Sequence, residues 1–247
     1  MLENQFITFT EFIPTDQEVA MPVRPNEDMQ FFYGAEIYTI YIAKPDGSYL
    51  KALPFSFVEA KDGKYNLFTI NVSGLVSGLV NNRQYRIVFA DKDNQKIYYS
   101  NLLINMPDAD ISMLRYACKE PAFGFPFGKD KDGNALFVQQ ALPIKLNAPQ
   151  YKQDDKIYTK RNGENVVLFA AITKEYEGHT DYIPMEWHEK ILMALSCDEV
   201  YINGERVTKN GSYEIDHDNY TYTDCGIKLL RATFKVTTNV TQRNSNY

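Results

Sequence analysis

The stretch from Val72 to Ile87 reads VSGLVSGLVNNRQYRI and leads into a strand with clear alternation. In that strand, Tyr85, Ile87 and Phe89 are spaced two residues apart, so their side chains are expected to share one face. The doubled Ser-Gly-Leu-Val is too short to indicate a repeat architecture. Its glycines favour a tight crossing between two sheets.

Short segments rich in Phe, Tyr, Ile and Val lie on both sides of this stretch, from about Phe6 to Asn105. Turn residues such as Pro45-Asp46-Gly47 separate them, as between the strands of a hairpin. Such spacing is typical of a sandwich. The expected strands are Gln5 to Phe9, Gln17 to Val23, Ile37 to Ala43, Phe55 to Ala60, Tyr65 to Asn71, Gln84 to Ala90 and Ile97 to Ile104.

The opening stretch resembles the tyrosine corner of fibronectin type III and immunoglobulin-like domains. In that motif a Leu, here Leu79, plugs the end of the sandwich, and a Tyr, here Tyr85, hydrogen-bonds back across the turn. The resemblance implies an N-terminal immunoglobulin-like β-sandwich over residues 1–105. It implies nothing about function, because folds of this class carry many functions.

Residues 106–140 differ in composition and are interpreted as a Phe/Gly/Pro-rich connector. Asp108 to Arg115 is compatible with a short helix. Phe123, Phe125 and Phe127 then alternate with Gly and Pro, which exclude a regular helix or a central strand. Two interpretations stay open: an aromatic plug between two domains, or an extended loop that docks into a neighbouring chain.

Residues 141–247 are expected to form a C-terminal β-rich domain with one amphipathic helix near residues 184–196, so the chain as a whole is predicted to be mostly β. Pro184 suits the first helical position, and apolar residues recur from Trp187 to Leu195 at helical spacing. The expected strands are Ile144 to Asn147, Asn165 to Glu175, Glu199 to Asn203, Ser212 to Asp216 and Ile227 to Thr238, with hairpin turns at Asn162-Gly163 and Asn203-Gly204.

Composition excludes several classes of function. The 247 residues carry 26 basic and 32 acidic side chains, a net charge of −6, which argues against a nucleic-acid groove. No apolar run is long enough for a membrane span. The N-terminus has Glu3 where a secretory signal would carry a basic residue, so synthesis for the cytoplasm is expected. Cys118, Cys197 and Cys225 lack metal-site spacing and are interpreted as buried or free thiols.

The motifs of catalysis and metal binding are incomplete. His188-Glu189 begins a zinc-protease pattern, but Leu192 stands where the second His belongs. His217 lies between two Asp residues, which suits either a divalent ion or an ordinary surface loop. Lys129 to Asn134 departs from a calcium loop and is interpreted as an Asp-Gly turn. The sequence thus predicts no catalytic residue, no metal ligand and no cofactor.

The stretch from Tyr158 to Tyr247 resembles, in a series of short matches, tail and neck structural proteins of tailed bacteriophages that infect Bacteroidetes, including the crAss-like phages. The matches include Lys174-Glu175-Tyr176, Thr180 to Pro184 and Val200 to Gly204. The resemblance implies a virion protein of a tail, ring or adaptor, assembled in the host bacterial cytoplasm. It carries over no active-site residue.

A non-enzymatic structural protein of a phage tail or neck is therefore the leading hypothesis. Its expected partners are copies of itself in a cyclic homo-oligomer and other tail, neck or portal-proximal proteins. Two other classes stay open: a glycan-binding module of a Bacteroidetes bacterium, and a hydrolase whose carboxylates, such as Asp154-Asp155 and Asp198-Glu199, are brought together by the fold. The residues predicted to form the subunit interface are Phe123, Phe125, Phe127, Asn244 and Tyr247.

Overall fold

The computed structural model describes residues 5–13, 18–24, 27–70, 84–92, 96–106, 111–119 and 128–244, with the backbone alone at 168–169 and 239–244. Over these residues the chain is mostly β with one helix, which confirms the predicted fold class. The strands of the N-terminal part are β1 (Phe9–Thr10), β2 (Met21–Val23), β3 (Met29–Tyr33), β4 (Ile37–Ala43), β5 (Tyr49–Ala52), β6 (Phe55–Glu59), β7 (Asn66–Ile70), β8 (Gln84–Asp91), β9 (Ile97–Ser100) and β10 (Leu103–Asn105).

These strands form two sheets around one aromatic core. The larger sheet has the order β1-β9-β8-β10-β2, and β4 pairs with both β8 and β5; the smaller sheet has the order β3-β7-β6. Phe31 of the smaller sheet stacks on Phe89 of the larger one, with ring centroids 5.7 Å apart. Tyr85, Ile87 and Phe89, the alternating residues of β8, are all fully buried.

Tyr85 makes a hydrogen bond to the neighbouring strand. Its hydroxyl lies 3.0 Å from Oδ1 of Asn105 on β10. Residues 71–83, which include Leu79, lie outside the described residues. The tyrosine corner and the immunoglobulin-like topology therefore stay predictions.

The C-terminal part is built on a second large sheet with the order β12-β11-β17-β18-β19-β15-β13, to which β14 and β16 add at β15 and β19. Its elements are β11 (Ser112–Ala117), β12 (Val138–Leu142), β13 (Ile144–Leu146), β14 (Gln150–Thr159), β15 (Asn165–Thr180), β16 (Ile183–Pro184), α1 (Met185–Leu195), β17 (Glu199–Ile202), β18 (Glu205–Tyr222) and β19 (Lys228–Asn244).

The short helix considered for Asp108 to Arg115 is wrong where the structure describes it, because Ser112–Ala117 is strand β11. β11 lies between β12 and β17, and both edges of its backbone are hydrogen-bonded. Leu114 and Tyr116 are buried in this position. Pairing on both sides outweighs a weak helix propensity. The range predicted as a connector thus contributes two strands, β11 and β12, to the second sheet.

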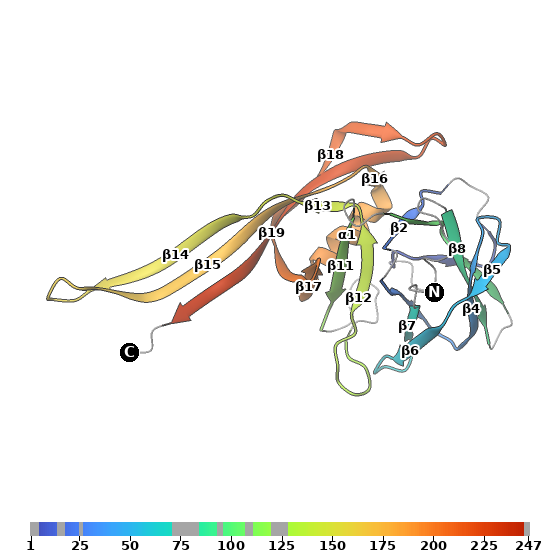
Figure 1. The fold of residues 1–247 in the computed structure, drawn as a ribbon, viewed down its shortest axis with the longest axis horizontal. Helices are drawn as coiled ribbons and strands as arrows, with labels where there is room; N and C mark the ends of the chain where they lie inside the picture. Colours follow the sequence, from blue (N-terminus) through green and yellow to red (C-terminus); the bar gives the residue numbers. More distant parts are fainter. Residues whose placement is uncertain are drawn as a thin grey trace.

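The predicted amphipathic helix is confirmed as α1. Pro184 precedes its first residue with an extended backbone, and Trp187, Ile191, Ala194 and Leu195 are buried, as their spacing predicts. The helix contacts β11, β16, β18 and β19. It therefore covers one face of the second sheet, at the junction seen near the centre of Figure 1.

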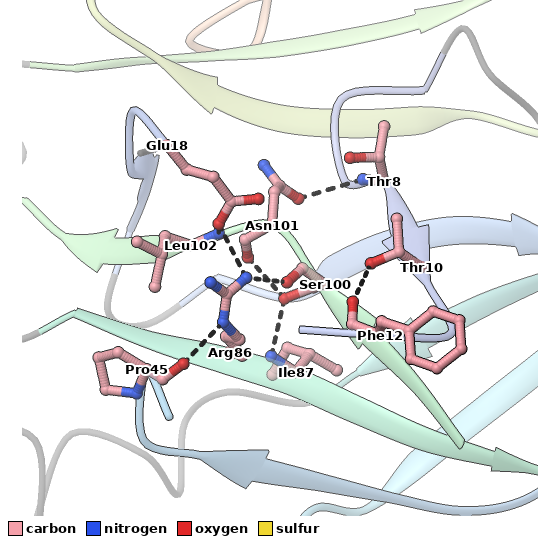
Figure 2. A network of polar contacts seen from close by, with 10 residues as sticks. All are labelled: Thr8, Thr10, Phe12, Glu18, Pro45, Arg86, Ile87, Ser100, Asn101 and Leu102. Atoms are coloured by element: carbon pink, nitrogen blue, oxygen red, sulfur yellow. Dashed lines mark hydrogen bonds and ion pairs between the residues drawn. The ribbon is translucent and has the colours of Figure 1, made fainter. Parts of the chain in front are cut away.

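A buried arginine holds the N-terminal segment against the larger sheet. Figure 2 shows Arg86 of β8 at the centre of a polar network, with its guanidinium 2.8 Å from Glu18 Oε2. The same guanidinium donates to the carbonyl oxygens of Ser100, at 2.6 Å, and Pro45, at 3.0 Å. The Ser100 hydroxyl in turn accepts from the amide of Ile87. Three separate stretches of chain are thus joined at one side chain.

Candidate protein-binding arm

Three strands leave the body of the molecule together and form a long ribbon. β14 pairs with β15 from Gln150 opposite Glu175 to Thr159 opposite Asn165. β19 pairs with the other edge of β15, as far as Asn244 opposite Phe169. Figure 1 shows these strands running away from the N-terminal sheets to a distant hairpin.

The hairpin turn has the residues that its geometry requires. Gly163 has φ 82°, a left-handed conformation that glycine adopts without a steric cost. Its amide donates to the Lys160 carbonyl, and the Asn162 side chain accepts from the Glu164 amide. The Asn-Gly turn predicted at this position is confirmed.

We define the arm as residues 150–175 together with residues 238–244. None of its described side chains from 150 to 175 is buried, and Tyr176 is the first buried residue beyond it. Tyr151, Ile157 and Tyr158 are 65%, 59% and 54% exposed. Alternation along β14 places Tyr151 and Ile157 on one face, together with Val167, the register partner of Ile157.

Such a ribbon lacks the usual source of stability. Strand ribbons of this size need a hydrophobic face that packs on something else, because backbone pairing alone is marginal in water. Among the described side chains of the arm, Tyr151, Ile157, Tyr158 and Val167 are instead exposed to solvent. Exposed apolar surface gathered on a projecting element is typical of a protein–protein contact.

The root of the arm is fixed by charged contacts with β18. Glu205 accepts hydrogen bonds from the Tyr176 hydroxyl at 2.7 Å and from Lys174 Nζ at 3.2 Å. The bond to Glu205 raises the pKa of Lys174. Glu175 accepts from Lys152 at 2.7 Å and from Asn210 at 2.9 Å, and the bond from Lys152 holds the pKa of the Glu175 carboxyl below its usual value. These bonds join the root of the arm to β18 by side-chain contacts in addition to the ladder.

The interface residues predicted from the sequence are only partly described. Phe123, Phe125, Phe127 and Tyr247 lie outside the described residues. Asn244 is the last residue of β19 and lies on the arm. The rest of the arm was missed as a site: a strand at Asn165 to Glu175 and the Asn-Gly turn are predicted from sequence, but their partner strand β14 is not.

The residues considered for catalysis or metal binding have other roles. His188 is fully buried on α1, between the Tyr213 hydroxyl and the Leu230 carbonyl. Asp130 accepts from the amides of Asp132 and Asn134, which gives the Asp-Gly turn predicted there.

The residues around Asp216 and the pair Asp154-Asp155 also have ordinary structural positions. Asp216, beside the exposed His217, accepts from the amides of Asp218 and Asn219. Asp154 and Asp155 are neighbours on a strand and so face opposite sides. Among the described residues, no three His, Cys, Asp or Glu side chains are grouped to hold a metal ion.

A polar hollow of about 530 Å³ lies at the junction of the two parts of the chain. Arg24 crosses this junction, donating to the Ile111 carbonyl at 3.0 Å and to Asn203 Oδ1 at 3.3 Å. Arg115, also in the lining, lies over the Phe137 ring at 4.0 Å from its centroid. The contacts of Arg24, together with that of Gln140 to the Pro22 carbonyl at 3.1 Å, attach the second sheet to the N-terminal sheets.

Comparison of the chain with protein-family models, with curated proteins and with solved structures finds no match. Within the part of the chain that the structure describes, no helix has both the length and the apolar character needed to cross a membrane. The arm is therefore the feature from which a function is best argued.

Proposed function

We propose that this protein is a non-enzymatic structural subunit that joins a neighbouring subunit through its arm. The observation that carries the proposal is the arm itself, a three-stranded ribbon without a buried side chain among its described residues 150–175. Its exposed apolar residues gain burial only from another chain. Each fully buried side chain of this size contributes on the order of 2 kcal/mol.

The proposed contact is compatible with a closed ring. An arm that projects from one side of a body and binds a different surface on the next copy makes a heterologous contact, which closes into a ring when the rotation allows it. A ring or adaptor of a phage tail or neck is an assembly of this kind. The resemblance of residues 158–247 to tail and neck proteins supports that assignment, and copies of this chain and other virion proteins are its proposed partners.

The first experiment tests the arm as the contact. Tyr151→Thr, Ile157→Thr and Val167→Thr together remove the apolar face and keep residues that favour strands. We expect wild type to form a discrete oligomer by mass photometry and the triple variant to be monomeric, with an unchanged circular dichroism spectrum. A matched control carries Thr at three apolar positions outside the arm, Phe12, Tyr38 and Val58, which are 81%, 77% and 42% exposed. This control is expected to assemble as wild type does.

A second variant removes the arm as a unit. The Asn147 amide donates to the Glu177 carbonyl at the root, so residues 149–175 can be replaced by Asn-Gly without disturbing that pair. The same variant ends after Thr237, which lies opposite Glu175. We expect a folded monomer. An arm-free chain that still assembles, or a wild-type chain that stays monomeric even with its co-expressed structural proteins, contradicts the proposal.

The virion assignment needs its own measurement. Proteomics of purified phage particles is expected to find the chain at a fixed ratio to the major tail proteins. Cross-linking of those particles is expected to join Lys152 or Lys156, on β14, to a second copy. Absence from the particles contradicts the phage assignment, and it leaves the arm-mediated assembly to be decided by the arm variants.

A further inference from the structure

Two cysteine side chains are in contact near the C-terminal end of α1. Cys118 directly follows the end of β11, and Cys197 lies in the turn between α1 and β17. Their Sγ atoms are 2.7 Å apart, although the residues are 79 positions apart in sequence. Cys118 is buried, at 5% exposed, and Cys197 is half-buried.

The backbone holds the two residues in place. Ala117 of β11 is in register with Glu199 of β17, so both cysteines adjoin the same end of one ladder. The Lys119 amide donates to Asp198 at 2.8 Å, and the Cys197 amide donates to the Ala194 carbonyl at 3.2 Å. The backbone on either side of each cysteine is therefore held by hydrogen bonds. A disulfide requires two cysteines whose backbones are already close, and this arrangement supplies them.

We propose that Cys118 and Cys197 form an intramolecular disulfide when the folded protein meets a small-molecule disulfide such as oxidised glutathione. The Cys197 sulfur, after losing its proton, attacks one glutathione sulfur and releases one molecule of reduced glutathione. The deprotonated Cys118 sulfur then attacks Cys197 and displaces the second glutathione. Two electrons pass to the oxidant, both thiol protons end on the two glutathione molecules, and one sulfur–sulfur bond replaces another.

The order of attack follows from exposure. Cys197 is the accessible member of the pair, whereas Cys118 is covered by the core. Burial and the contact with Cys118 raise the pKa of Cys197, so little thiolate is present at neutral pH. Because the thiolate is the attacking species, the reaction is slow at pH 7 and accelerates as the pH rises.

The test uses a Cys225→Ser background, which removes the exposed Cys225 thiol as a competing site of reaction with glutathione or with another molecule. The folded protein is incubated with a mixture of oxidised and reduced glutathione and then alkylated in denaturant. We expect an intact mass lower by two hydrogen atoms and a linked pair of peptides containing Cys118 and Cys197. We also expect a thermal midpoint higher by about 5 °C, because the bond closes a long loop of the unfolded chain.

A second variant separates the two chemical steps. With Cys118→Ser in the same background, a glutathione adduct is expected to persist on Cys197, since no second thiol displaces it. Two free thiols, or a lasting glutathione adduct, in the parent protein overturns the proposal. If the buried Cys118→Ser change prevents folding, the mass and peptide measurements on the Cys225→Ser protein still decide whether the disulfide forms.

Discussion

The Tyr213 hydroxyl donates a hydrogen bond to Nδ1 of His188 across 2.7 Å. The direction of this bond follows from the other side of the ring, where Nε2 lies 3.1 Å from the Leu230 carbonyl oxygen. A carbonyl oxygen only accepts, so Nε2 carries the proton and Nδ1 accepts. A neutral imidazole therefore links α1 to β18 and β19 in the core.

Stability is expected to fall in acid because of this histidine. Burial lowers the pKa of His188 below 6.5. Between the folded and unfolded pKa values, the histidine is therefore protonated in the unfolded chain and neutral in the folded one. The contribution is intact above pH 6.5 and is lost as the pH falls below it, by at most about 1.4 kcal/mol per pH unit. Urea unfolding at pH 7.5 and 5.0 measures it. His188→Gln is expected to reduce the pH dependence, whereas His217→Gln, at an exposed position, removes only the smaller Coulombic cause of the lowered His188 pKa and is expected to retain most of it.

Tyr213→Phe tests the same hydrogen bond at a single pH, without replacing the histidine. It removes the hydroxyl and leaves the buried Nδ1 of His188 without its donor. We expect a loss of about 1 to 2 kcal/mol in unfolding free energy. Tyr220→Phe, on an exposed tyrosine of the same strand, serves as the control and is expected to match wild type. Equal stabilities of the two variants contradict the assigned role.

Arg86→Met is expected to cost about 3 kcal/mol. The change leaves the Glu18 carboxylate and the Ser100 and Pro45 carbonyls without a shared donor in a largely buried place. Denaturant unfolding measures the loss. Lys92→Met is the comparison, because the ion pair of Lys92 with Glu36 has both side chains 58% exposed. A loss no larger than that of Lys92→Met rules out the network as a stabilising element.

Gly178→Ala is expected to destabilise the protein by about 1 to 3 kcal/mol through overpacking. A Cβ at this position lies only 2.5 Å from Cζ of Phe234, its buried register partner on β19. Phe234→Leu is expected to cost less when combined with Gly178→Ala than when made alone. A double-mutant cycle measures this coupling, and strictly additive costs contradict the clash.

The sequence predicts those elements of the fold that bury one face. β4 has the predicted bounds, Ile37–Ala43, and α1 lies within the predicted residues 184–196. β17, at Glu199–Ile202, ends at the predicted Asn203-Gly204 turn. In these elements the apolar period matches the buried face, so pattern and structure agree.

Among the elements without such a face, β6 and the first part of β15 are predicted, but β3 and β14 are missed. β3, at Met29–Tyr33, is buried along nearly all its length and shows no alternation. In β14, by contrast, all ten residues are exposed. Because neither face is buried, its sequence shows no alternation of apolar and polar residues. The arm could not be found as a site for this reason. A strand that packs on no core of its own chain carries no periodic apolar pattern by which it can be predicted.

The continuity of β15 has a mechanical consequence. This strand runs unbroken from Asn165 at the hairpin to Thr180, which is fully buried in the body. The ladder bonds to β14 and β19 lie perpendicular to the strands. A pull along the ribbon therefore shears many bonds at once instead of opening them one after another, so the ribbon resists tension along its length better than peeling.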